Sequence, residues 1–180
     1  MKTVLPLSFD RTVPDGDTLV RDVCGHCGFV DYKNPKIVVG SVVRHAGKIL
    51  MCRRAIEPRK GFWTVPAGYM ELNESPETGA AREAMEEACA SIRIEGLLAV
   101  YSVPRISQVQ LIYRAALANP AIAAGPESLE VALFGWDEIP RDDIAFPTVH
   151  WMLAAEKAVQ EGRATPPFFN PPGDTADATE

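Results

Sequence analysis

The sequence lacks long apolar runs: no stretch of about 18 consecutive apolar residues occurs in its 180 residues. The N-terminus also lacks a basic start that leads into an apolar segment, so no secretory signal is indicated. Cysteines are few, and only Cys24 and Cys27 of the four lie close together in sequence, which argues against a disulfide framework. These absences predict a cytoplasmic protein that does not span a membrane.

Basic residues are too few to give the chain a positive charge. Eighteen lysines and arginines stand against 24 aspartates and glutamates, which gives a net charge of −6. Such a chain is not expected to bind nucleic acid through electrostatic attraction to the phosphate backbone. To bind an anionic ligand it would need a metal ion or arginines that make the potential positive at the binding site. Hydrophobic residues make up 47% of the sequence, which is enough for one domain with a sizeable core.

The most informative stretch runs from Gly68 to Ala90 and predicts a loop followed by a helix. Ser75 can cap free amides, Pro76 suits the first turn, and Glu77 places an acid at the positive end of the helix. At about 3.6 residues per turn, we expect a small apolar face close to a sheet and a charged face opposite. The apolar face comprises Ala80, Ala81, Ala84, Met85 and Ala88, and the charged face comprises Arg82, Glu83, Glu86 and Glu87.

Three glutamates crowd one patch of this helix, since Glu83 and Glu87 are one turn apart and Glu86 lies between them. Like charges at this spacing repel each other unless a positive group lies among them. Mg²⁺ would supply that charge, because it binds carboxylate oxygens and keeps waters or substrate phosphates in its other positions. Arg82 can fix one carboxylate through a bidentate contact. A solvated helix face is the alternative interpretation of the same residues.

The whole spacing resembles the signature of the Nudix hydrolases, which cleave nucleoside diphosphates linked to another moiety. Gly68 is followed after five residues by Glu74, and after seven more by Arg82-Glu83-x-x-Glu86-Glu87. The resemblance implies an α/β fold, an α/β/α sandwich with a mixed sheet. The match is incomplete: alanine stands at the aliphatic positions 84 and 90, and the loop reads Pro66-Ala67-Gly68 where many relatives have two glycines. Cys89 replaces the usual glycine, so we expect the helix to end differently here.

Residues 12 to about 160 resemble one Nudix subgroup more closely, the zinc-ribbon-bearing enzymes described as ADP-ribose or FAD pyrophosphatase-like. The resemblance lies in Asn34–Gly40, Cys52–Arg59, Arg105–Val109 and Ala145–Pro147. It implies a Mg²⁺-dependent enzyme, with Mn²⁺ as an alternative metal, that cleaves the diphosphate of a small-molecule nucleotide to AMP and a phosphorylated moiety. It also implies a homodimer.

Residues 1–35 form an expected zinc-ribbon-like segment, because Cys24-x-x-Cys27-Gly28 is half of a zinc ribbon. A structural zinc site takes four ligands, and the positions for a second knuckle, Met1 to Val4, hold no cysteine. We therefore expect a degenerate ribbon that keeps its hairpin without metal. The alternative is a Zn²⁺ ion shared across a dimer, with Cys24 and Cys27 from each chain.

The hydrolase domain is expected to span residues 36–162, followed by a disordered tail, 163–180, in which Phe168-Phe169 could dock on the domain. Apolar and β-branched runs predict strands at 35–43, 49–53, 92–103, 109–116 and 131–136. Trp63 is expected in the core. The final helix, 148–162, is expected to turn Trp151, Ala154, Ala155, Ala158 and Val159 inward.

The resemblance and the chemistry together predict the site residues. Glu83, Glu86 and Glu87 would hold Mg²⁺ with a backbone carbonyl of Gly68, and Glu71 is a further candidate ligand. Arg82 and Glu74 would orient these ligands. The resemblance implies a further carboxylate from a loop outside this stretch, which acts as a metal ligand or general base. The candidates are Glu127 and Glu130, and we prefer Glu130. Guanidinium groups suit phosphate oxygens, so the substrate-binding candidates are Arg53, Arg54, Arg59 and Arg105.

Other functions share parts of this pattern. A nucleoside triphosphate pyrophosphohydrolase carries the same glutamates. An NADH pyrophosphatase combines a zinc ribbon with them, but its Ser-Gln-Pro-Trp-Pro-Phe-Pro segment is missing here. A catalytically silent nucleotide sensor is disfavoured by the intact Arg-Glu-x-x-Glu-Glu, and a zinc-ribbon adaptor by the incomplete cysteine set.

Overall fold

The chain divides into two compact units between Pro35 and Lys36. The computed structural model describes residues 8–176. The N-terminal unit is a three-stranded antiparallel sheet in the order β1 (Phe9–Thr12), β2 (Arg21–Cys24) and β3 (Val30–Asp31). Between β2 and β3 the chain makes a tight knuckle, in which hydrogen bonds from the amides of Cys27 and His26 lower the pKa of the Cys24 thiol. The positions expected for a second knuckle, 1–4, lie outside the described residues.

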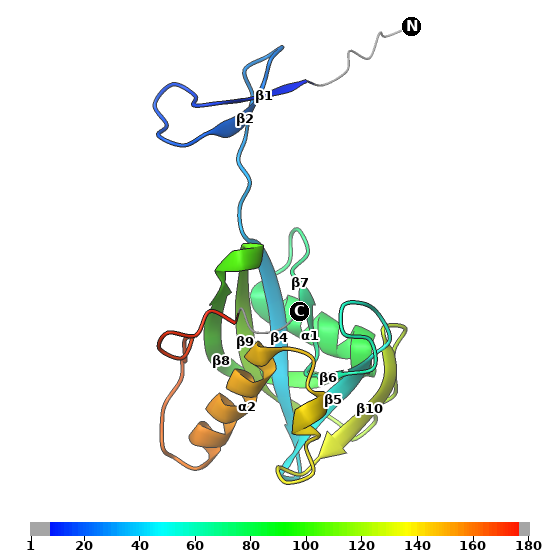
Figure 1. Ribbon diagram of the computed structural model, residues 1–180. Helices are drawn as coiled ribbons and strands as arrows, with labels where there is room; N and C mark the ends of the chain where they lie inside the picture. Colours follow the sequence, from blue (N-terminus) through cyan, green and yellow to red (C-terminus); the bar gives the residue numbers. More distant parts are fainter. Residues whose placement is uncertain (1–7, 177–180) are drawn as a thin grey trace, which may run out of the picture. The chain divides into compact units, whose positions relative to one another are not determined.

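The C-terminal unit is built on a mixed sheet (Figure 1), as the sequence predicts. β4 and β9 run parallel, whereas the other neighbouring strands are antiparallel. The main path of the sheet is β10 (Ser128–Phe134), β5 (Lys48–Arg54), β4 (Lys36–His45), β9 (Gln108–Leu117) and β8 (Ile92–Val103), and the short strands β6 (Trp63–Thr64) and β7 (Ala67–Tyr69) pair with β5 and β4.

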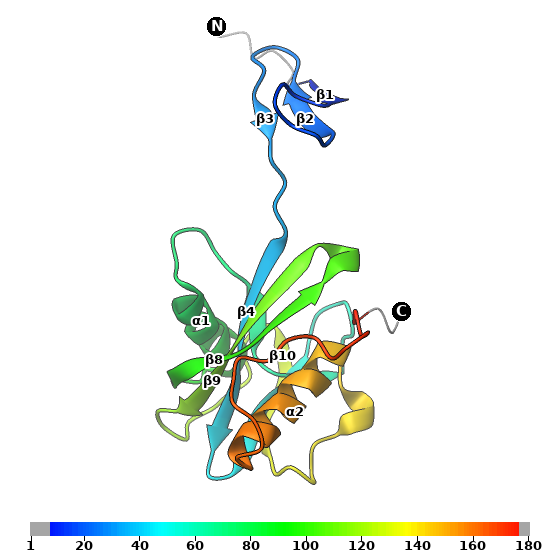
Figure 2. The ribbon, with the colours of Figure 1, turned by 90° about the vertical axis from the view of Figure 1, so that its left-hand side faces the viewer.

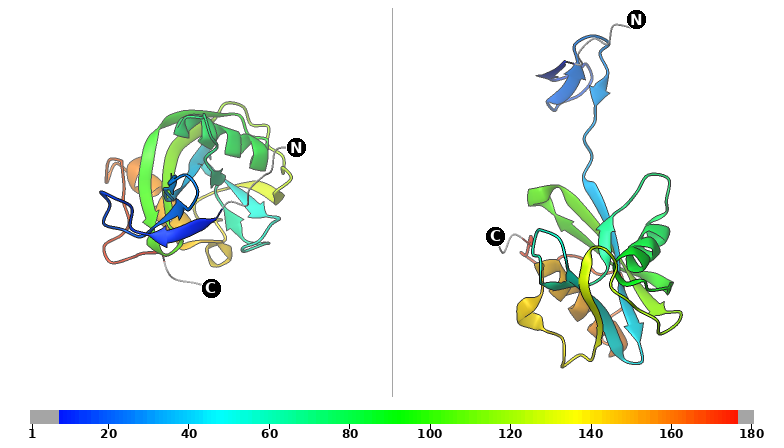
Figure 3. Two further views of the ribbon diagram at one scale, coloured as in Figure 1. Left: turned by 90° about the horizontal axis from the view of Figure 1, so that it is seen from above. Right: turned by 90° about the vertical axis from the view of Figure 1, so that its right-hand side faces the viewer.

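Two helices, α1 (Pro76–Ala88) and α2 (Pro147–Gln160), cover opposite faces of this sheet, as the two side views in Figures 2 and 3 show. Alternation along the strands explains the two cores, because successive side chains point to opposite faces. Ile49 and Met51 join Trp63 in the core beneath α2, whereas Leu50 and Cys52 pack under α1. Short 3₁₀ turns, η1 (Pro104–Ile106) and η2 (Arg141–Asp143), complete the unit. No helix within residues 8–176 is long and apolar enough to cross a membrane.

The helix α1 starts as predicted, with Ser75 accepting a hydrogen bond from the Thr78 amide at 3.2 Å. Its expected faces were partly wrong. Glu83 and Glu87 are buried, at 7% and 6% exposed, whereas Met85 is 47% exposed. At about 100° per residue, Glu87 lies about 20° from Ala80 around the axis, so both glutamates flank the buried alanines rather than oppose them.

The C-terminus of α1 also departs from expectation. Cys89 adopts the left-handed conformation, with φ 48°, that a glycine would ordinarily take, and its amide donates to Met85 O at 2.9 Å. The helix therefore ends in the usual way for a left-handed cap, at the cost of about 1 kcal/mol of strain in a non-glycine residue.

The helix α2 is fixed by a buried ion pair. Glu156 is fully buried and accepts hydrogen bonds from the Arg114 guanidinium of β9 at 2.7 and 3.1 Å. Ala154, expected to face inward, is exposed, and Met152 and Leu153 fill the core instead. Ala155 and Ala158 are buried as expected, but at about 100° per residue Ala154 lies about 160° from Met152 around the helix axis, so it cannot share the buried face.

The expected disordered tail is ordered in residues 163–176, while 177–180 lie outside the described residues. The Phe168 amide donates to Leu98 O at 2.8 Å, and the Val100 amide donates to Phe168 O at 2.9 Å, so the tail pairs with the edge strand β8. Asn170 continues this pairing through both backbone groups of Ser102. The free edge of β8 supplied the hydrogen-bonding partner that composition alone did not reveal.

Phe168→Ala is expected to lower the free energy of unfolding by about 2 kcal/mol, because the ring packs against the core beneath α2. Phe169→Ala is the matched control, since that ring is 66% exposed. Denaturant unfolding of both variants gives the comparison. Equal, near-zero effects would show that the tail does not contribute to the domain.

Candidate functional site

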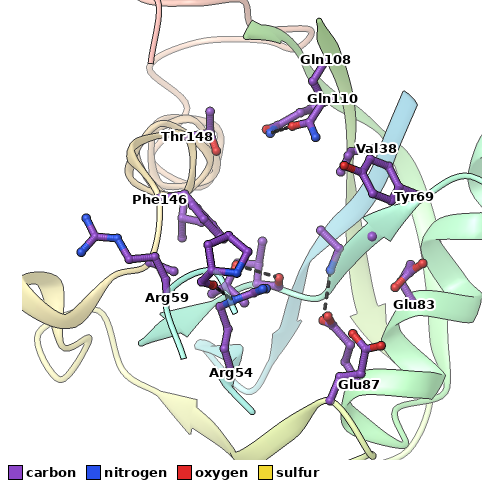
Figure 4. A pocket seen from close by; sticks show the side chains of 18 of the residues that line it. Val38, Arg54, Arg59, Tyr69, Glu83, Glu87, Gln108, Gln110, Phe146 and Thr148 are labelled. Atoms are coloured by element: carbon purple, nitrogen blue, oxygen red, sulfur yellow. Dashed lines mark hydrogen bonds between the residues drawn. The ribbon is translucent and has the colours of Figure 1, made fainter. Parts of the chain in front are cut away.

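A cavity of about 1060 Å³ opens between the sheet and the loops of the C-terminal unit. This volume is in the range of small-molecule sites. The cavity is lined from α1, β4, β7 and β9, from the loop after β5, and from the segment that leads into α2. Figure 4 shows Glu83 and Glu87 on one wall, Arg54 and Arg59 across from them, and Gln108 and Gln110 at the other end.

Glu83 meets the backbone of β7 at unusually short range. A Cβ placed on Gly68 would lie 2.4 Å from Glu83 Oε2, so only glycine leaves room for this carboxylate. Beside it, Glu87 Oε2 accepts a hydrogen bond from the Ala67 amide at 3.2 Å. The Pro66-Ala67-Gly68 loop thus positions both carboxylates, although it has one glycine where many relatives have two.

Arg82 holds the surrounding carboxylates in place. Its guanidinium donates two hydrogen bonds to Glu74, at 2.8 and 3.1 Å, and single ones to Glu83 at 2.7 Å and Glu86 at 2.8 Å. The contact with Arg82 lowers the pKa of Glu74 to about 2. Glu74 also accepts a hydrogen bond from the Glu71 amide at 2.7 Å. These contacts place Arg82 and Glu74 where groups that orient the other carboxylates are expected, and that role stays a prediction.

The surroundings of the two buried carboxyl groups disfavour a negative charge on them. Burial raises the pKa of Glu87 to about 8, and repulsion from Glu83 and Glu127 adds to this rise, while the Ala67 amide and Arg54 oppose it. Burial also raises the pKa of Glu83, against the effect of Arg82. A divalent cation among these groups would supply the missing positive charge.

The donor set suits a hard cation. Glu83, Glu86, Glu87 and Glu71 offer carboxylate oxygens, and the Gly68 carbonyl is a further oxygen at the same wall, all ligand types that Mg²⁺ and Mn²⁺ prefer. Within residues 8–176, no three His, Cys, Asp or Glu side chains converge as they stand into a group that could hold a metal ion. The exposed Glu86 side chain, turned toward Arg82, would have to swing to join Glu83 and Glu87.

The cationic candidates separate into two sets. The first set lines the cavity and comprises Arg54, Arg59 and Arg105, of which Arg105 lies just before the start of β9. Arg53 does not line the cavity: its Nε donates to Gly61 O at 2.8 Å, and its guanidinium lies 3.7 Å from Glu130. Arg53 and Arg54 are neighbours on β5, so their side chains must point to opposite faces.

The structure reverses the preference between the two loop acids. Glu130 lies in β10 opposite Arg53, with its side chain 55% exposed and outside the cavity. Glu127 lines the cavity and lies close enough to Glu87 to raise its pKa. A backbone hydrogen bond from the Ala55 amide to Glu127 O, at 2.8 Å, anchors this position. The feature of the sequence that could have separated the two acids is the start of β10. Glu127 lies just before this strand and lines the cavity, whereas Glu130 lies within the strand and outside the cavity.

Several cavity residues were not found from the sequence, among them Tyr69, Gln108 and Gln110. Gln108 and Gln110 lie at the far end of the cavity from Glu87, and Tyr69 lies between them and Glu83 (Figure 4). Their positions follow from pairing between β7, β4 and β9, which no local pattern in the sequence specifies. Cys24 and Cys27 belong to the other unit, and a zinc role for them stays a prediction.

Comparison with known proteins gives two family matches. A model described as "NUDIX domain" matches residues 34–154, and a zinc-ribbon model described as "Nudix N-terminal" matches residues 7–33. The solved structure of a NUDIX hydrolase from Nitrosomonas europaea is similar to this one, with a TM-score of 0.85 and 45% sequence identity, over 89% of this chain and 92% of that chain.

Two curated proteins are also similar. The "MutT-like protein" of Streptomyces ambofaciens is 36% identical over 102 residues, which cover 57% of this chain and 64% of that protein. The "ADP-ribose pyrophosphatase" of Methanocaldococcus jannaschii is 27% identical over 114 residues, 61% of this chain and 68% of that protein. The matched part thus spans less than two thirds of the first relative's length.

Gly68→Ala is expected to weaken Mg²⁺ binding by about tenfold or more, because the added Cβ would displace the Glu83 carboxylate. Isothermal titration calorimetry measures this effect. Gly135→Ala is the matched control, since its Cβ would meet only the end of the exposed Glu138 side chain. Wild-type affinity in Gly68→Ala would contradict the placement of the metal site.

Proposed function

Because the chain belongs to the Nudix hydrolase family, we propose that it hydrolyses the diphosphate of a nucleoside diphosphate derivative of the ADP-ribose or FAD type. With ADP-ribose, water would add across the P–O–P bridge to give AMP and ribose 5-phosphate. The relative from Methanocaldococcus jannaschii, named as an ADP-ribose pyrophosphatase, supports this substrate class.

The observation that carries the proposal is the pairing of opposite charges across one cavity. Buried Glu83 and Glu87 form one wall, and Arg54 and Arg59 lie across from them, so a diphosphate between them could meet a metal ion and guanidinium groups together. The chain's net charge of −6 makes this local arrangement necessary for an anionic substrate, and it disfavours nucleic acid as a partner.

Each wall has a distinct part in the reaction. Glu83, Glu86 and Glu87, with the Gly68 carbonyl and Glu71, would hold the metal, which when bound neutralises phosphoryl charge and lowers the pKa of a water. Arg54 and Arg59, with Arg105, bind and orient the phosphate oxygens. Arg82 keeps the carboxylates directed at the cavity through hydrogen bonds to the carboxylates of Glu74, Glu83 and Glu86 and to the Tyr69 carbonyl.

Glu127 is the proposed general base. It is a carboxylate on the cavity wall, on a loop separate from α1, and it lies near Glu87 without belonging to the Arg82 network. A carboxylate in this place can accept a proton from the attacking water, while Glu83, Glu86 and Glu87 would serve as metal ligands.

Mg²⁺ is the expected metal, with Mn²⁺ as a substitute, and a homodimer and a cytoplasmic location are expected from the resemblance and the sequence. The main alternative function is hydrolysis of nucleoside triphosphates, because those enzymes use the same glutamates. A nucleotide sensor without turnover is the alternative outside catalysis.

Incubation with Mg²⁺ and, separately, ADP-ribose, FAD and a deoxynucleoside triphosphate is expected to release AMP from one of the first two. Glu87→Gln should lower that rate by about 100-fold, since it removes a charged metal ligand. Glu77→Gln is the control, an exposed acid on the same helix outside the cavity. Pyrophosphate released from the triphosphate alone would support the alternative hydrolase, and binding without turnover would support the sensor.

Glu127→Gln is expected to lower kcat by about 100-fold with a smaller change in KM, because it removes the proposed proton acceptor. Glu130→Gln should stay within about twofold of wild type, since its side chain is exposed on β10. Steady-state kinetics on the two variants decides between them. A large loss of kcat in Glu130→Gln with little change in Glu127→Gln would instead support Glu130, the residue preferred from the sequence.

A further inference from the structure

A buried amide at the far end of the cavity lacks a hydrogen-bond partner. Gln110 is 9% exposed, and its Oε1 has no partner within residues 8–176. Its Nε2 donates to Gln108 Oε1 at 2.8 Å, which fixes the direction of the amide. A buried, unpaired acceptor costs free energy, so its presence on a cavity wall calls for a ligand that donates an N–H or O–H there.

The surface beside this amide is shaped for a flat ring. Tyr69 pairs with Val38 across β7 and β4, and Val38 pairs with Gln110 across β4 and β9. Residues paired across neighbouring strands share a face, so an aromatic ring, an apolar side chain and the amide form one row. Tyr69 is 53% exposed, and the Lys36 ammonium lies 5.1 Å from its ring centroid, so one face of the ring is left for stacking. Figure 4 shows this row on the cavity wall, opposite Thr148.

We propose that Gln110 is a specificity-determining residue that binds the nucleobase of the substrate, and that this base is adenine. Oε1 accepts a hydrogen bond from the exocyclic amine, and the second Nε2 hydrogen is donated to the adjacent ring nitrogen, the pairing that a glutamine amide makes with adenine. Gln108 is a positioning residue, because it engages the other Nε2 hydrogen and fixes the direction of the Gln110 amide.

The charge distribution supports a base rather than a phosphate at this end. The unpaired atom of Gln110 is an acceptor, and phosphate oxygens are acceptors too, so the two would not bond. Arg54, Arg59 and the carboxylates lie at the other end, where the diphosphate is proposed to bind. The inference rests on the proposed function for the place of the diphosphate, and it adds the residue that recognises the adenine base.

Calorimetric titration with AMP and with purine riboside 5′-monophosphate, which lacks only the exocyclic amine, tests the inference. Wild type should bind AMP roughly 10-fold or more tightly, in line with the discrimination of one bidentate pair. Gln110→Leu should bind the two nucleotides equally. Gln160→Leu, the same change at an exposed glutamine of α2 outside the cavity, should keep the preference.

Equal binding of both nucleotides by wild type, no binding of AMP, or a retained preference in Gln110→Leu would each overturn the inference. Gln110→Met, a second variant of similar size, and thermal unfolding of all variants exclude misfolding as the cause of a lost preference. Turnover of ADP-ribose without an AMP preference would contradict this inference alone. An AMP preference without any turnover would contradict the proposed function alone.

Discussion

The contact between the Glu83 carboxylate and the bare backbone of Gly68 is the constraint on which the site depends. It requires α1 to lie very close to the sheet, and the fully buried Ala80, Ala84 and Ala88 allow that approach. Burying carboxylates at such a contact is costly unless they are paired. Arg82 and the Ala67 amide offset part of the cost, and the remaining negative charge is what a divalent cation would neutralise.

The cavity assigns different chemistry to different walls. The acidic wall comes from α1 and β7, the basic wall from the end of β5 and the loop after it, and the end with Gln108 and Gln110 from β9. In the proposed function, an acidic protein binds an anion because a metal ion and arginines reverse the local charge. The same separation places the Gln110 amide where the base is proposed to lie.

Local signals in the sequence predicted much of this molecule, including the helix that starts after Ser75 and the strands that flank it. The errors arose where a side chain's direction depends on a partner strand. Arg53 and Arg54 read alike in sequence, but strand alternation sends only Arg54 into the cavity. Burial of Glu87 could have been derived from helical geometry, since it lies beside Ala80. The sequence suggested that Phe168 could dock on the domain, but its pairing with β8, and the row that contains Gln110, depend on long-range pairing and could not be derived.

The central claim is that one cavity brings a metal ion, held by Glu83 and Glu87, against the diphosphate of a nucleotide. The most direct measurement is anomalous diffraction from crystals grown with Mn²⁺ and a non-hydrolysable methylene analogue of ADP-ribose. The account predicts a Mn²⁺ peak bonded to both carboxylates and to a phosphate oxygen of the analogue. A Mn²⁺ peak elsewhere, or an analogue bound with its phosphates away from α1, would contradict it.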